Sequence, residues 1–327
     1  MKSSASANKR NPSSRLVSDK SVQHVYKRTL DNGVLFYRSI DRLVFFTIQS
    51  VCARKHRVQV LVASYMYTHV HEAVRVFDAS QLAAYERDVN SIFAKEYNRE
   101  TGRTGPVFES PYGRAPKMGD KSVRSCLAYV VNNPVEKKLC RLAEEDRWTF
   151  LAYYTQAFPF SKRPQLSRAR SCLREAIKIV SHECAAGRYL HYALLHRLFA
   201  PLDHLEREQL TDYIIQCYFF FDSDECCRYF GTIDKMVAAV GVVTGSEFDV
   251  GEVFEPFSDI PYKEMCDLAE KHKLLGRGLP FLHFPEERVT KFMRYLREHT
   301  SATGRQLSRF LHQPRVSGNA WGFKRGE

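Results

Sequence analysis

The chain has 327 residues, 44% of them hydrophobic, which is enough to bury a substantial core and to build two or three domains. Lysine and arginine number 49 against 37 aspartate and glutamate, a formal net charge of +12, so a polyanion is the expected partner. No apolar run approaches the 20 or so residues of a membrane-spanning helix, and the first 22 residues are polar and basic. We therefore expect a globular, cytoplasmic protein without a membrane partner.

The nine cysteines are an odd number, and no two of them form a Cys-x-x-Cys pair. Adjacent Cys226 and Cys227 lack the two-residue gap that zinc knuckles use. The pattern predicts reduced thiols rather than a disulfide framework or a structural zinc site.

The N-terminal half predicts an α+β fold. Residues 1–22 carry many Ser, Asn, Lys and Arg and are expected to form a disordered basic tail. Apolar residues at helical spacing predict a helix over 34–57, and alternating β-branched and aromatic residues predict two strands over 57–76. An amphipathic helix over 79–102, closed by Gly102, follows.

A turn-rich stretch with one short strand leads from there to a further helix. This helix should begin near Asp120 as N-cap and end by Asn133, because Pro134 disfavours helical geometry in the residue before it. The order of elements predicts an antiparallel sheet with helices on its faces. We expect this domain to cover 23–158.

The rest of the chain is predicted to be helical. Residues 159–278 show helical patterns and no chemical motif. In 279–327, one helix with an apolar face is followed by a cap at Ser301 or Thr303 and by a second helix that ends before Pro314. Two short helices with a tight turn are typical of a helix-turn-helix, with Arg305, Gln306 and Arg309 as DNA contacts; an ordinary helical hairpin is the alternative.

His69 and His71 lie in a predicted strand, with one residue between them. Because alternate side chains of a strand share a face, both imidazoles can reach one divalent cation. Two polar residues that happen to share a face would give the same pattern, so the pair alone does not decide. In the helix that begins near Asp120, Tyr129 and Asn133 lie four residues apart beside the apolar stripe, which places a hydroxyl and an amide together.

Four segments together resemble a known family: "THVH", "NRETGRTGPVFESPYGRAP", "YVVNNPVEKKLC" and "DRWTFLAYY". Their order and spacing are similar to those of the single-tyrosine HUH transposases of insertion sequences, particularly the REP-associated tyrosine transposases. The resemblance runs from about Val25 to Tyr154 and implies an HUH-type fold. The chain departs from the pattern around the histidines, where Met66-Tyr67-Thr68 precedes them and Glu72-Ala73 follows.

The resemblance implies roles for particular residues. His69, His71 and Asn133 would hold Mg²⁺ or Mn²⁺, and Tyr129 would be the nucleophile that cleaves single-stranded DNA through a 5′-phosphotyrosine. DNA, single-stranded or in a hairpin, is then the expected partner, and the protein could act as a homodimer. Near this site the basic residues Lys55, Arg57, Arg103 and Arg114 are predicted to contact the DNA backbone.

Two other functions fit the same sequence less well. A domesticated descendant could keep the basic surface and act as a non-catalytic DNA-binding regulator. An RNA-processing nuclease on a similar scaffold would need an acid and a base instead of a tyrosine and a metal. Metal dependence and a tyrosyl adduct distinguish the transposase from both.

Overall fold

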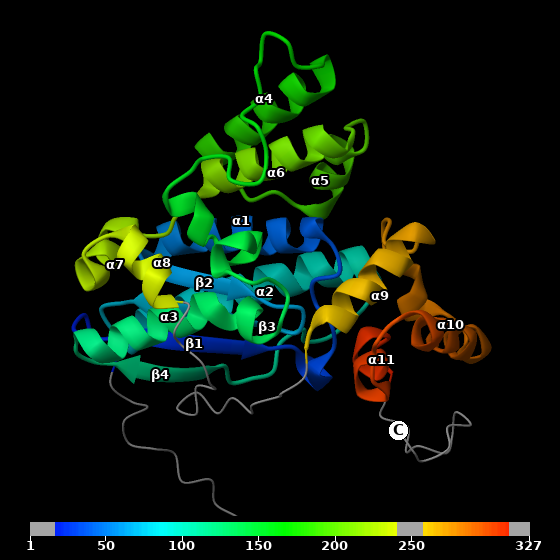
Figure 1. The fold of residues 1–327 in the computed structure, drawn as a ribbon, viewed down its shortest axis with the longest axis horizontal. Coiled ribbons are helices and arrows are strands. Elements are labelled where there is room, and N and C mark those ends of the chain that lie inside the picture. The colour runs from blue at the N-terminus through cyan, green and yellow to red at the C-terminus, as the bar shows by residue number, and fades with distance from the viewer. Residues whose placement is uncertain (1–16, 241–257, 314–327) are drawn as a thin grey trace, which may run out of the picture.

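A four-stranded antiparallel sheet forms the centre of the N-terminal half, as the computed structural model of residues 17–240 and 258–313 shows (Figure 1). The strand order is β2-β3-β1-β4. The expected α+β class with an antiparallel sheet is confirmed. The strands are β1 (Val22–Arg28), β2 (Gln59–Tyr65), β3 (His69–Arg75) and β4 (Gly113–Lys117).

Strand β1 is central in the sheet, yet the sequence reasoning missed it. Val22 was assigned to the disordered tail, whose residues 1–16 lie outside the described part of the chain. Instead, Val22 starts the strand and is fully buried. The strand buries Gln23, His24 and Lys27 beside its valines, so it lacks the apolar alternation that identifies a strand.

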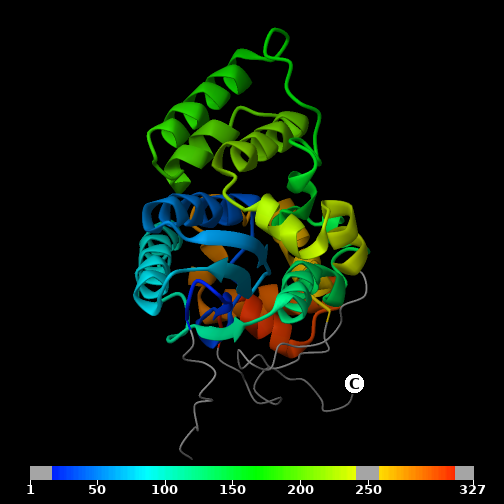
Figure 2. The same ribbon diagram turned by 90° about the vertical axis from the view of Figure 1, so that its left-hand side faces the viewer.

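Helices α1 (Ser39–His56) and α2 (Ala79–Thr101) cover one face of the sheet (Figure 2). Helix α2 ends at Gly102 as predicted, with a left-handed φ of 69° that glycine adopts easily. Helix α1 begins at Ser39 rather than at residue 34. The Asp41 carboxylate accepts the backbone N–H groups of Tyr37 and Arg38, which fixes the helix start and leaves the chain before it extended.

Helix α3 (Asp120–Glu136) packs on the other face of the sheet. Its N-cap is Gly119 rather than Asp120, and it continues through Pro134, where the sequence predicted an end. Proline has no N–H to donate to the carbonyl of Val130. The side-chain amide of Asn133 lies 3.5 Å from that carbonyl and 3.1 Å from the carbonyl of Tyr129, so it supplies a donor where the backbone lost one.

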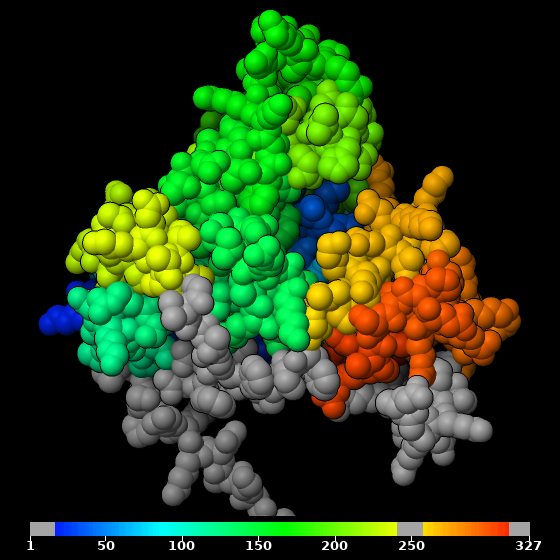
Figure 3. Space-filling model, in the orientation of Figure 1, coloured from blue at the N-terminus to red at the C-terminus, as the bar shows by residue number. Residues whose placement is uncertain are grey.

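The helices beyond the sheet domain pack in three places. Helices α4 (Ser171–Ala185), α5 (Tyr192–Phe199) and α6 (His204–Tyr218) form a lobe over α1, and α7 (Ser223–Phe230) and α8 (Ile233–Val240) lie beside α3. A third group contains α9 (Ile260–Lys271), α10 (Glu286–His299) and α11 (Gly304–Phe310). Figure 3 shows this group and the upper lobe as separate projections, with α1 visible between them.

Short 3₁₀ helices connect these parts. They are η2 (Leu30–Asn32), η3 (Ala143–Glu145), η4 (Arg147–Thr149), η5 (Leu151–Tyr154) and η7 (Pro280–His283). All nine cysteines are free thiols. In the described ranges, no helix has both the length and the apolar character required to cross a membrane.

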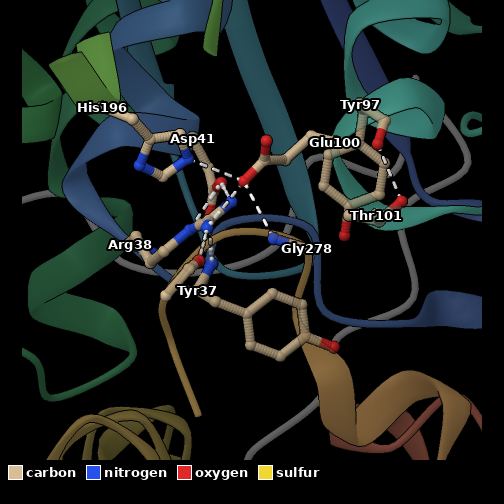
Figure 4. A network of polar contacts seen from close by, with 9 residues as sticks. Tyr37, Arg38, Asp41, Tyr97, Glu100, Thr101, His196 and Gly278 are labelled. Carbon is tan, nitrogen blue, oxygen red and sulfur yellow. Dashed lines mark hydrogen bonds and ion pairs between the residues drawn. The ribbon is translucent and has the colours of Figure 1, made fainter. Parts of the chain in front are cut away.

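A buried polar network joins the sheet domain to the lobe of α4 to α6 and to the group of α9 to α11 (Figure 4). Arg38 pairs with Asp41 at 2.6 Å and with Glu100 at 3.0 Å, and it also donates to the carbonyl of Gly276. Glu100 accepts a hydrogen bond from Gly278 and contacts His196 on α5. Burial acts to raise the pKa of Glu100, but the contact with His196 and the charge of Arg38 outweigh it and lower this pKa. The network therefore fixes three segments at one point.

Candidate active site

The two predicted metal-binding histidines lie on the sheet face that α3 covers. Their strand β3 pairs with β1, where His69 is opposite Arg28 and His71 is opposite Tyr26. Directly paired residues of an antiparallel sheet share a face, so His24, Tyr26, His69 and His71 all project toward α3. Glu72 projects to the other face, into the core under α1 and α2.

The ring of His71 contacts two other rings of the same face. Tyr26 stacks on it at 4.7 Å between centroids, and His24 stacks at 5.2 Å. Burial, followed by the charges of His69, His24 and Lys137, lowers the pKa of His71 well below its usual value. His71 is therefore a neutral imidazole at physiological pH, which is the form that binds a metal cation.

Each of the two histidines uses its Nδ1 atom in a hydrogen bond. Nδ1 of His69 lies 3.1 Å from the Thr68 hydroxyl, and Nδ1 of His71 lies 3.0 Å from Nε2 of His24. Metal-binding histidines commonly hold their second ring nitrogen in such a bond, which fixes the orientation of the ring. Nε2 is thus the nitrogen that each ring would offer to a cation.

Tyr129 lies over this pair, on the inner face of α3. Its ring makes edge contacts with His71 at 5.6 Å and with His24 at 5.7 Å between centroids. The residue is 5% exposed. Residues 123, 127, 130 and 131 of α3 are buried as its apolar stripe, and this packing directs Tyr129 toward the histidines. The structure therefore brings His69, His71 and Tyr129 together.

Asn133 lies one helical turn after Tyr129 and is 1% exposed. Its amide nitrogen donates to the Tyr129 carbonyl, which leaves the amide oxygen at the opposite end of the group. Within the described residues, no three His, Cys, Asp or Glu side chains are placed to hold a metal ion. A cation on the histidine pair would need another oxygen donor, and the amide of Asn133 is of the right chemical type. Metal binding stays a prediction.

Three residues of the site were missed in the sequence: His24, Tyr26 and Lys137. The first two lie on the strand that was not predicted, and their alternate spacing in "QHVYK" is the only local sign that they share a face. Lys137 follows the end of α3, and its charge contributes to the lowered pKa of His71.

The predicted DNA contacts of the sheet domain are spread over different places. Lys55 pairs with Asp88, and Arg57 ends α1 near Gln59, which is opposite Arg75 at the end of the sheet farthest from His69. Arg114 is opposite Val25, so it lies on the face away from the histidines. None of these three shares the face of the tyrosine; their role in DNA binding stays a prediction.

The C-terminal helices occur where the sequence predicted them. Thr303 caps α11 and receives the N–H of Gln306, whose amide also donates to the Ser258 carbonyl. Gln306 is 5% exposed, so in this conformation it serves the helix start rather than a base edge. Arg305 and Arg309 line a pocket together with Arg103. A DNA-binding helix-turn-helix stays a prediction.

Comparison with known proteins gives one distant likeness. No family model matches the sequence, and no curated protein matches it. A solved structure described as "Structure of the REP associates tyrosine transposase bound to a REP hairpin" matches with a TM-score of 0.33 and 9% identity, over 41% of this chain and 78% of that chain. At this level of similarity, the function has to be inferred from the side chains of the chain itself.

Proposed function

We propose that this protein is a metal-dependent DNA strand transferase of the single-tyrosine HUH type, which cleaves and rejoins single-stranded DNA. One observation carries the proposal: the ring of Tyr129 lies 5.6 Å from that of His71, over a face that also holds His69. A tyrosine held against a buried histidine pair is suited to transfer of a phosphoryl group. The net charge of +12 suits a nucleic acid substrate.

The reaction would proceed by two transesterifications. The Tyr129 Oη atom attacks the scissile phosphorus and forms a 5′-phosphotyrosine, while the 3′ oxygen leaves and takes up a proton. The 3′-hydroxyl of a second strand then attacks the phosphotyrosine and releases the tyrosine. The phosphotyrosine keeps the energy of the broken bond, so joining needs no nucleotide cofactor.

The residues His69, His71 and Asn133 would hold Mg²⁺ or Mn²⁺. When bound, the cation supplies positive charge that stabilises the phosphate oxygens during attack. Tyr26 and His24 both contact the ring of His71, and α3 holds Tyr129 against it. The chain thus fixes the nucleophile and the proposed ligands relative to one another before DNA binds.

The experiment is incubation of the full-length protein with labelled single-stranded DNA from the region flanking its gene, with Mg²⁺ or Mn²⁺, followed by denaturing gels. We expect a covalent protein–DNA band that chelator abolishes and that Tyr129→Phe lacks. Tyr26→Phe is the matched control, because it removes the other hydroxyl of the same site and keeps the stacked ring. The band should persist in it.

A DNA-binding regulator is the second candidate, and the same experiment addresses it. Tight DNA binding with no adduct under either cation would refute the transferase and favour the regulator. An adduct that persists in Tyr129→Phe and is lost in Tyr26→Phe would show that Tyr26, and not Tyr129, is the nucleophile.

A further inference from the structure

The C-terminal helix α11 is docked on the sheet domain at the end of β1. The Tyr37 hydroxyl donates to the carbonyl of Phe310, and the backbone N–H of Val34 donates to the carbonyl of Arg309. Phe310 and Leu307 are buried in a core that also contains Tyr37. The helix is therefore held against the segment that follows β1.

His312 completes this junction. Its Nε2 atom lies 2.8 Å from the Val34 carbonyl, and its Nδ1 atom lies 3.1 Å from Nη1 of Arg103. Burial, together with the charge of Arg103, lowers the pKa of His312 to about 4. A neutral ring donates from Nε2 to the carbonyl and accepts at Nδ1 from the guanidinium, so His312 orients Arg103.

Gly33 makes room for this ring. A Cβ atom at this position would lie 2.6 Å from Cε1 of His312, closer than real Cβ contacts. The backbone of Gly33 has φ −62°, a value that other residues adopt without strain. The space that His312 fills is therefore what requires glycine here.

A pocket of about 560 Å³ opens at this junction, and three arginines line it. Arg103 comes from the loop after α2, whereas Arg305 and Arg309 come from α11. Asp31 is the acidic residue of the lining, so three guanidinium charges face one carboxylate. The side chains of Asn32 and Ser308 add hydrogen-bonding groups. Arginine's planar fork matches two phosphate oxygens at once.

The segment that carries Gly33 follows β1, the strand that pairs with the histidine strand β3. Gly33 follows Arg28 by five residues, and Arg28 is the sheet partner of His69. At about 3.3 Å per residue, Gly33 therefore lies within about 17 Å of Arg28.

We infer that Arg103, Arg305 and Arg309 form one binding pocket for backbone phosphates of the DNA on which Tyr129 acts, a pocket that exists only when α11 is docked. The inference rests on the proposed function for the identity of the ligand. Arg103, on the loop after α2, and the two arginines of α11 would thus contact the DNA at one composite site and not at two separate places.

The test measures binding of the full-length protein to a fluorescein-labelled single-stranded DNA and to a labelled hairpin, by anisotropy across about 50 to 200 mM salt. We expect Arg305→Ala to weaken binding about ten-fold and to reduce the salt slope by about 0.7 to 0.9, the loss of one phosphate contact. Arg305 is exposed, so this change leaves folding intact. Arg197→Ala, an exposed arginine on α5, is the control and should bind as wild type does.

The variant Gly33→Ala tests whether DNA binding depends on the shape of the pocket or only on its positive charge. It leaves every charge in place but displaces His312, so we expect weaker binding than wild type and a thermal midpoint that is lowered by a few degrees because the junction is overpacked. If Gly33→Ala and Arg305→Ala both bind as tightly as wild type does, the pocket is not a DNA site. His312→Leu, which removes the partner of Arg103, provides a second variant should Gly33→Ala unfold.

The tyrosyl adduct is measured on the same proteins, so that a failure of the pocket proposal can be distinguished from a failure of the transferase proposal. Normal DNA binding by Arg305→Ala and Gly33→Ala together with an adduct would overturn the pocket and leave the transferase. Weakened binding without an adduct in wild type would support the pocket and refute the transferase.

Discussion

His71 has a protonation state that its neighbours determine. Its ring is fully buried in contact with Tyr26 and His24, and its pKa is lowered, so it carries one proton on one of two nitrogens. If Nδ1 carries that proton, it donates to Nε2 of His24 and leaves Nε2 of His71 as a metal ligand. We therefore expect His24 to position His71 in the proposed cation site.

Replacing His24 should weaken metal binding without touching a ligand. We expect His24→Leu, which removes the acceptor, to reduce Mn²⁺ affinity by about 10- to 100-fold. His24→Gln retains an acceptor oxygen and should recover most of the loss. Isothermal titration calorimetry with Mn²⁺, in the absence of DNA, measures this independently of catalysis. Equal Mn²⁺ affinities for wild type and His24→Leu would rule out the proposed role.

Helix α3 carries Tyr129 and Asn133, and its geometry depends on an asparagine–proline pair. Pro134 cannot donate to the Val130 carbonyl, and the Asn133 amide contacts that carbonyl instead. Asn133 thus has a structural role in the helix and a proposed role at the metal. Both roles predict that Asn133→Ala is harmful, so the single variant does not separate them.

A double-mutant cycle with Pro134→Ala separates them. Alanine at 134 restores the backbone donor, so Asn133→Ala should cost about 1 to 3 kcal/mol of unfolding free energy in the wild-type background and clearly less in the Pro134→Ala background. Urea denaturation measures both costs. Adduct formation should be lost in both Asn133→Ala proteins if the amide binds the metal. An adduct at wild-type level in either would remove Asn133 from the ligand set, and equal stability costs would show that the amide does not replace the proline donor.

The elements that the sequence predicted well have local causes. Strands β2 and β3 follow from their alternation, and α2 follows from its apolar stripe and Gly102. The continuation of α3 past Pro134 depends on one side-chain hydrogen bond, and the helix propensities of single residues do not include such a bond. Strand β1 depends on burying Lys27 against carboxylates from β3 and α2, partners that are distant in sequence.

The site residues also divide into those that a local motif predicts and those that only distant contacts bring together. His69, His71 and Tyr129 were predictable because short motifs carry them. His24 reaches His71 across 47 residues and Arg103 reaches His312 across 209, so only the folded chain places them. The docking of α11 on the sheet domain is likewise a tertiary contact without a local pattern.

A buried charge cluster lies behind the histidine face, in the core that joins the sheet to α1 and α2. Lys27 pairs with Glu72 at 2.6 Å and with Glu86 at 3.2 Å, and all three are essentially inaccessible. Glu72 also accepts hydrogen bonds from Gln49 and Tyr85. Burial raises the pKa of Glu86 to about 8, and the nearby Glu72 adds to this against the attraction of Lys27. At neutral pH, Glu86 therefore keeps its proton in the folded protein.

This proton makes the stability of the whole molecule depend on pH. Glu86 has a higher pKa folded than unfolded, so its contribution is fully present below about 4.5, the value expected in the unfolded chain, and is lost as the pH rises through about 8. Over this window, the folded state holds a proton that the unfolded state has released. The free energy of unfolding should fall by up to about 1.4 kcal/mol per pH unit from this group. Glu86→Gln keeps a hydrogen-bonding side chain but cannot titrate.

We expect the stability difference between Glu86→Gln and wild type to shift in favour of the variant as the pH rises from 5 toward 8. Urea denaturation of both proteins at several pH values measures this difference, in which the titration of other groups cancels. Glu287→Gln, an exposed carboxylate on α10, is the control and should follow wild type across the range. A difference that stays constant from pH 5 to 8 would mean that Glu86 is already ionised in the folded protein, with Lys27 holding two carboxylates at once.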